Sequence, residues 1–155
     1  MKASTRTSTR LSIVLSGLFL ALLGVAAVFV PAFADRLLAG ADATWARFTA
    51  VGTMYGILLS AVAADLLLIA LLRLVLRGEV FTDSSVSLIR AVSWCCMLCG
   101  GLSTVLGIVG ALLENVFLFA FLAAFAAILL GICLRVVKNV IETAMEIKRE
   151  NELTV

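Results

Sequence analysis

Asp65 is the one acidic residue that lies deep inside a long apolar segment of this chain. An ionised side chain at the centre of a bilayer costs at least about 2.5 kcal/mol, so an acid at that depth is a candidate for binding a proton or another cation. Arg73 follows eight residues later, about 12 Å along a helix, and lies on a neighbouring face. The structural alternative is a protonated carboxyl, or one that is hydrogen-bonded to a serine of another helix.

The surroundings of Asp65 can be predicted from depth. A helix rises about 1.5 Å per residue, and counting from the basic residues at the ends of each apolar segment places Asp65 level with three other sites. These are Ser16, residues 95–99 and Ala127. Ser16 is therefore the candidate polar neighbour of Asp65 within the membrane.

The four cysteines, Cys95, Cys96, Cys99 and Cys133, form the second group that could do chemistry. Cys95 and Cys99 are one helical turn apart, which suits a redox pair or a metal site. They lie inside an apolar segment, in the half nearer the cytoplasm by the charge pattern described below, where disulfides are not favoured. The chain has no histidine, the commonest metal ligand. We interpret the cysteines as small apolar packing residues and expect no metal and no cofactor.

Motifs for other chemistry are missing from the sequence. It has no phosphate-binding glycine loop, no Gly-x-Ser-x-Gly, no His-Glu-x-x-His and no basic–aromatic patch for nucleic acid. We therefore expect a protein that is not an enzyme and does not bind nucleic acid directly.

Composition predicts the elements that must position these residues. Of 155 residues, 63% are hydrophobic and 14% are charged, whereas a soluble domain carries about 25% charged residues. The apolar residues come in blocks long enough to cross a bilayer as helices. We predict one all-α membrane domain with four transmembrane helices, arranged as two hairpins and followed by a helical tail over residues 138–155. The predicted spans are about 11–34, 48–76, 86–113 and 116–137.

The first span could instead belong to a signal peptide, because a basic start precedes it and Ala32-Phe33-Ala34 resembles a cleavage site. The apolar run from Leu11 to Val30 has 20 residues, against about 7–15 in a signal peptide. We therefore expect an uncleaved span.

Orientation follows from the basic residues. The two short connections hold only Arg36 and Arg47, and Trp45 lies there as an expected interfacial aromatic. Positive charge stays on the cytoplasmic side, so we predict that both termini and the region between the second and third spans are cytoplasmic. The basic residues on this side are Lys2, Arg6, Arg10, Arg73, Arg77, Arg90, Arg135, Lys138, Lys148 and Arg149.

Residues 77–90, called the hinge below, form the one sizeable polar interruption between the spans. Gly78 is placed to end the second helix in the left-handed conformation. Asp83, Ser84 or Ser85 can cap the third helix. We expect Phe81 to pack against the helix ends or the tail, because a large apolar side chain is poorly placed in a solvated loop.

Small residues recur at every fourth position of the later spans and predict close helix contacts. The spacing fits packing within one chain, and equally the seam of a homodimer. The candidate packing residues are Gly52, Gly56, Ser60, Ser103, Gly107 and Gly131.

The run Gly78-Glu79-Val80-Phe81-Thr82, then Arg90 and Trp94, resembles the signature of a bacterial membrane protein family, domain of unknown function 2975 (DUF2975). The end of the chain, residues 150–155, also resembles the end of family members. Ser85 stands where an Asn is usual. The resemblance implies four spans, a bacterial cytoplasmic (inner) membrane, and a regulatory or accessory role, because members often lie beside short helix-turn-helix regulators.

Two functions are carried forward from the sequence. The first is a non-enzymatic sensor, regulatory or accessory protein that acts through its hinge and tail on another membrane or cytoplasmic regulatory protein, or on a second copy. The alternative is a small oligomeric transporter or ion- or proton-coupled carrier that uses Asp65. A carrier requires a water-accessible path to Asp65, whereas an interaction protein requires a sealed bundle. The candidate partner surface comprises Gly78, Glu79, Phe81, Thr82, Asp83, Arg90 and Trp94.

Overall fold

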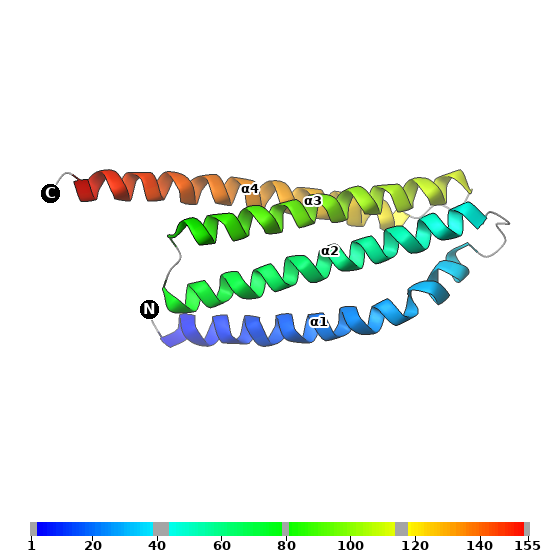
Figure 1. Ribbon diagram of the computed structural model, residues 1–155, viewed down its shortest axis with the longest axis horizontal. Coiled ribbons are helices and arrows are strands. Elements are labelled where there is room, and N and C mark those ends of the chain that lie inside the picture. Colours follow the sequence, from blue (N-terminus) through cyan, green and yellow to red (C-terminus); the bar gives the residue numbers. More distant parts are fainter. Residues whose placement is uncertain (1–2, 39–43, 79–80, 114–117, 154–155) are drawn as a thin grey trace.

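Four long helices make up the computed structural model, which describes residues 3–38, 44–78, 81–113 and 118–153, with side chains over residues 8–150 of these ranges. All four are long and apolar enough to cross a membrane, and the chain is a multi-pass membrane protein. They follow one another with both termini and the hinge at one end, the hinge end, and the other two connections at the opposite end, the loop end (Figure 1). The helices are α1 (Ala3–Leu37), α2 (Thr44–Arg77), α3 (Asp83–Leu112) and α4 (Leu118–Leu153).

The helices have 30 to 36 residues, so each is about 45–54 Å long, against about 30 Å for the hydrocarbon core. α1 and α2 start before the predicted spans, at Ala3 and Thr44. Within the predicted connection from Asp35 to Arg47, residues 35–37 belong to α1 and residues 44–47 to α2. An ion pair joins the two helices here, because Arg47 Nε lies 2.8 Å from Asp35 Oδ1. The predicted turn at residues 114–115 lies outside the described residues.

Proline 31 lies inside α1. Its ring nitrogen has no hydrogen, so the carbonyl of Ala27, four residues earlier, loses its helical donor. The hydroxyl of Tyr55 on α2 donates to that carbonyl at 3.3 Å. Figure 1 shows α1 bending toward the other helices in this region. The bend brings Ala34, which is fully buried, into contact with a cluster on α2 that includes Met54.

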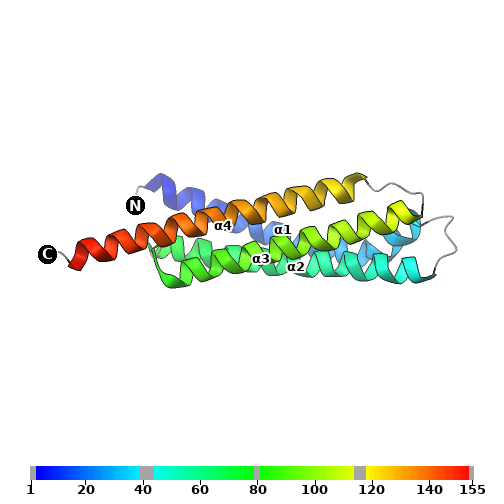
Figure 2. The same cartoon turned by 90° about the horizontal axis from the view of Figure 1, so that it is seen from above.

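The helices are arranged in chain order rather than as a closed ring. Within the described residues, the backbones of α1 and α2, of α2 and α3, and of α3 and α4 approach one another closely, and no other pair does. α1 and α4 are thus the outer helices (Figures 1 and 2). Side chains of α1 reach α3 at the loop end, where Leu38 clusters with Val109. Two apolar clusters of buried residues lie toward that end.

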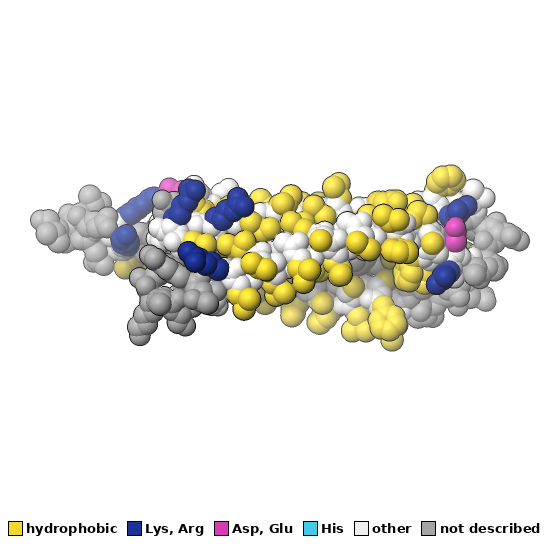
Figure 3. All heavy atoms as spheres, turned by 90° about the horizontal axis from the view of Figure 1, so that it is seen from below, with side chains coloured by type: hydrophobic (Ala, Val, Ile, Leu, Met, Phe, Trp, Pro, Cys, Tyr) yellow, Lys and Arg dark blue, Asp and Glu magenta, His cyan; other side chains and the backbone are white. Residues whose placement is uncertain are grey.

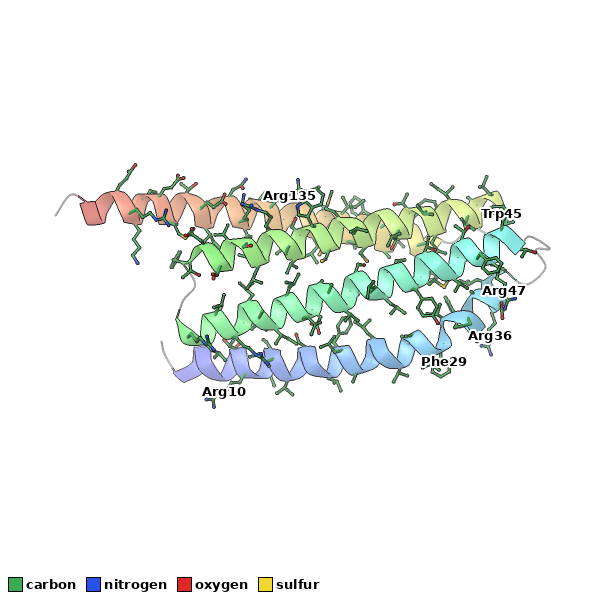
Figure 4. The ribbon with its side chains drawn as sticks, viewed as in Figure 1. Arg10, Phe29, Arg36, Trp45, Arg47 and Arg135 are labelled. Atoms are coloured by element: carbon green, nitrogen blue, oxygen red, sulfur yellow. The ribbon has the colours of Figure 1, made fainter. Side chains whose placement is uncertain are left out.

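Most large hydrophobic side chains of the helices are exposed. Figure 3 shows them covering the middle of the molecule, with Lys and Arg gathered near its two ends. Figure 4 shows Arg10 at the hinge end of α1, and Arg36, Trp45 and Arg47 at the loop end. Such a surface belongs in lipid, with its charged ends in the headgroup regions.

Candidate functional site

The hinge begins and ends with two distinct caps. Gly78 follows α2 with a φ of 81°, as predicted, and its N–H donates to the Val75 carbonyl at 3.1 Å. The N-cap of α3 is Thr82, not one of the predicted residues 83–85. Thr82 is extended, with φ −132° and ψ 152°, and its side chain accepts from the Ser85 N–H at 3.3 Å. Asp83 already lies inside the helix, so it cannot take the cap position.

The predicted packing of Phe81 is wrong, because 56% of this residue is exposed. The buried side chains at this end of the molecule belong to the helices instead. Val86 and Ile89 of α3 are buried, and so is Met145 of α4, which is only 9% exposed. The backbone of α4 approaches α3 and no other helix within the described residues, which indicates that Met145 is buried against α3. Glu79 lies outside the described residues.

Polar contacts join the first half of α3 to the part of α4 beyond residue 137, called the α4 extension. Arg149 Nη2 lies 3.2 Å from Asp83 Oδ2, and Arg90 Nη2 lies 3.4 Å from Glu142 Oε1. Lys138 Nζ is 2.8 Å from Glu142 Oε2. The extension is helical to Leu153, as predicted, and it runs past the ends of the other helices (Figure 1).

Trp94 continues this row of contacts toward the membrane. The guanidinium of Arg135 lies 4.8 Å from the centre of its ring, and Figure 4 shows Arg135 on α4 beside α3. Trp94 lies eleven residues into α3, about 16 Å from its start, so it is not part of the hinge surface. The contacts Asp83–Arg149, Arg90–Glu142 and Trp94–Arg135 are together called the α3–α4 ladder.

The pKa of Glu142 is lowered by the hydrogen bond from Lys138, with a smaller contribution from Arg90. Glu142 lies beyond the predicted fourth span, on the α4 extension. Its carboxylate is open to solvent, which screens its ion pairs, so these pairs contribute little to stability. The burial of Met145 is therefore the larger source of stability at the ladder.

Asp65 is the second candidate site. The residue is 7% exposed, and its Oδ2 has no hydrogen-bond partner among the described residues. It lies where two cavities of about 290 Å³ and 480 Å³ meet, since Phe19, Asp65 and Leu68 line both. The further lining residues that the depth argument predicted are Ser16 in the larger cavity and Cys95, Cys96, Cys99 and Ala127 in the smaller.

The serines near Asp65 are oriented by their own helices. Ser12 Oγ donates to the Ser8 carbonyl at 3.1 Å, and Ser60 Oγ donates to the Ile57 carbonyl at 2.8 Å. Both serines line a cavity with Asp65. The carboxylate thus faces apolar side chains and a few hydroxyls, and no Lys or Arg is among the described residues lining either cavity.

All four cysteines are free, and three line the smaller Asp65 cavity while Cys133 is exposed on α4. In the described part of the chain, no group of three His, Cys, Asp or Glu side chains is arranged to hold a metal ion. Cys95, Cys96 and Cys99 therefore form a wall of the Asp65 cavity.

The small residues separate into contact and surface positions. A Cβ on Gly56 would meet Leu102 at 2.9 Å, one on Gly107 would meet Phe121 at 2.9 Å, and one on Gly131 would meet Met97 at 3.2 Å. Gly52 makes no such contact within the chain, because it is exposed with nothing within 4 Å of an added Cβ; of the two predicted alternatives, only the seam of a homodimer could use it. Ser103 is buried, and Ser60 is half-buried.

The glycine with the closest neighbours in the described chain was not predicted. A Cβ on Gly100 would lie 2.6 Å from Ile128 and 3.1 Å from the Ala124 carbonyl oxygen. Nearby, the buried Ser93 hydroxyl donates to the Gly131 carbonyl at 2.8 Å. The adjacent glycines 100 and 101 were the available signal, but the sequence does not reveal which of the two faces α4.

Comparison with known proteins identified one family. The model described as "Protein of unknown function (DUF2975)" matches residues 10–155, in agreement with the resemblance of the hinge and the C-terminal residues. No curated protein and no solved structure matched the chain.

Proposed function

Because the chain belongs to the DUF2975 family, whose function is unknown, we propose its role from the arrangement of the hinge end. The proposed role is that of a non-enzymatic regulatory or accessory protein of the bacterial cytoplasmic membrane. It acts by binding a protein partner with its hinge and α4 extension. The observation that carries this proposal is the α3–α4 ladder, which joins the hinge and the α4 extension into one element at the hinge end.

Phe81 is exposed at the end of this element, in the hinge. Phe81 lies between the end of α2 and Asp83, beyond the apolar middle of the helices. An exposed aromatic ring among charged residues is typical of a residue that contacts a partner or the membrane interface. The ordered caps on either side hold it in place, which lowers the entropy cost of binding.

Photocrosslinking tests this proposal in native membranes. p-Benzoylphenylalanine replaces Phe81, and in a matched control it replaces Phe119, an exposed aromatic at the loop end. We expect a discrete protein adduct from position 81 and none from position 119. An adduct of twice the chain mass identifies a second copy as the partner. Lipid adducts alone at position 81 would contradict the proposal.

The cytoplasmic placement of this surface is tested separately. Ser84 is exposed in the hinge, and a single cysteine placed there should resist an impermeant maleimide in whole cells and react after lysis. Labelling before lysis would place the hinge outside and remove the proposed cytoplasmic partner.

A second candidate function, a cation- or proton-coupled carrier, is favoured by the unpartnered Oδ2 of Asp65. The larger cavity runs from Asp65 toward Ser12 near the hinge end, which supports access from that side. In proteoliposomes, a carrier should show cation-dependent flux that is lost in Asp65→Asn. Equal flux in wild type and variant would exclude Asp65 as the coupling site.

A further inference from the structure

We infer that the two cavities at Asp65 form one binding site for an amphipathic organic amine, a molecule with a protonated amino group and an apolar body. The inference uses the same carboxylate as the proposed carrier, but it concerns binding alone. It holds equally for the ligand of a sensor.

The charge of the ligand follows from Asp65. More than nine-tenths of this residue is buried, and its Oδ2 has no partner in the described chain. A buried carboxylate that stays ionised needs a cation with hydrogen-bond donors beside it. Arg73 lies about 12 Å further along α2, and no basic residue lines either cavity among the described residues. The cation must therefore come from the ligand.

A divalent metal ion does not fit this site. Ca²⁺ takes six to eight oxygen ligands and Mg²⁺ six, whereas the other side-chain oxygens lining the cavities belong to Ser12, Ser16 and Ser60. The hydroxyls of Ser12 and Ser60 donate to carbonyls of their own helices. The remaining surface is mostly aliphatic, aromatic and thiol. Such a lining matches a ligand with its own apolar body.

The shape of the site separates the two parts of the ligand. Asp65 lies where the cavities of about 290 Å³ and 480 Å³ meet. Ligand pockets of this size are mostly apolar, with a few polar groups that fix orientation. An ammonium at the junction pairs with the Asp65 carboxylate, and Phe19, which lines both cavities, supplies an aromatic ring at the same point. The apolar body extends toward the cysteines or toward Leu72.

Equilibrium binding of radiolabelled 2-phenylethylamine tests the inference on the full chain in phosphatidylcholine nanodiscs. The neutral competitor is 2-phenylethanol, which has the same ring and chain length. We expect saturable binding that the unlabelled amine displaces at a concentration at least ten times lower than the alcohol does. Absence of saturable binding, or equal displacement by the two compounds, would overturn the inference without any variant.

Two carboxamide variants then locate the charge. Asp65→Asn keeps the size of the side chain and should weaken amine binding at least tenfold. Asp35→Asn is the matched control, because Asp35 pairs with Arg47 at the loop end, and it should leave binding unchanged. Binding that survives in Asp65→Asn would overturn the inference.

Cysteine protection then locates the apolar body. In single-cysteine variants, the amine should slow the reaction of N-ethylmaleimide with Cys96, which lines the cavity, and not with Cys133, which is exposed on α4. Equal protection at both positions would place the amine in bulk lipid. Amine binding without flux in proteoliposomes would contradict the carrier function but would not contradict the amine-binding site.

Discussion

The α3–α4 pair and the α1–α2 pair are held together in different ways. Between α3 and α4, close approaches continue over most of the length, from Gly107 against Phe121 to Asp83 beside Arg149. Between α1 and α2, the apolar cluster of Ala34 and Met54 and the hydrogen bond from the Tyr55 hydroxyl both lie toward the loop end. Toward the hinge end, α1 borders the larger Asp65 cavity.

This difference indicates a division of roles. Elements with few buried contacts open at low free-energy cost, and elements with continuous packing do not. We therefore expect the α3–α4 pair, called the frame below, to be the rigid part of the molecule that holds the hinge and the α4 extension in place. α1 is the wall of the Asp65 site, and its apolar core contacts lie toward the loop end, at Val30, Ala34 and Leu38.

The largest effect is expected from breaking the frame at its hinge end. Met145→Ala removes a buried side chain, and Met→Ala changes in cores cost about 2–5 kcal/mol; the lower half of this range applies at the end of a helix. Hydrogen exchange in nanodiscs should become faster over residues 83–90 and 140–150. Ile147→Ala is the matched control, because Ile147 is 55% exposed. Equal exchange in the two variants would show that the ladder is not held by apolar burial.

The adjacent glycines allow the frame to be tested at mid-depth. Gly100→Ala places a Cβ against Ile128 and the Ala124 carbonyl, and such overpacking costs about 1–3 kcal/mol. Gly101→Ala meets nothing within 4 Å and should be neutral or slightly stabilising. The comparison is the unfolding free energy in mixed micelles. A similar loss in both variants would place α4 on a different face of α3.

The anchor of α1 can be weakened through one hydroxyl. Tyr55→Phe leaves the Ala27 carbonyl without its donor, which should cost about 1 kcal/mol. In a Pro31→Ala background, residue 31 supplies the helical N–H again, so the same change should cost less. A double-mutant cycle measures this coupling. A coupling of zero would mean that Tyr55 does not compensate for the proline.

The smallest effect is a pH dependence of the ladder. The folded-state pKa of Glu142 is lowered, first by Lys138, so its stabilising contribution is present above the unfolded pKa of about 4.3 and is lost as pH falls through the folded value. Acid titration should therefore make hydrogen exchange slightly faster over the α4 extension, while the burial of Met145 keeps the extension on α3. Glu142→Gln should remove this part of the pH dependence.

The neighbours of Asp65 were predictable because helical rise is nearly constant. Depth alone assigned Ser16, Cys95 and Ala127 to the level of Asp65, and these residues line its cavities. Helix rotation was not predictable, because repeats of small residues fix a face only when the partner is known. Gly52 was therefore assigned to a contact that it does not make within the chain, and Gly100 was missed.

For the hinge, the end of α2 was predictable from the sequence, but the packing of the side chains was not. Gly78 ends α2 as glycine chemistry requires, but Thr82, rather than the residues after it, caps α3. Phe81 was expected to pack against the helix ends or the tail, because its hydrophobicity was the only guide. The buried position belongs to Met145, which lies more than 60 residues later and is brought there by the length of α4.

Distance measurements between spin labels test the difference between frame and wall most directly. Labels at Ser87 and Thr143 report on α3–α4, labels at Arg36 and Leu112 report on the loop end of α1, and labels at Leu18 and Leu129 span the Asp65 site; all six positions are exposed. In nanodiscs we expect narrow distributions for the first two pairs and a distribution at least twice as broad for the third. Equal widths for all three pairs would contradict the division into a fixed α3–α4 frame and a loosely held α1.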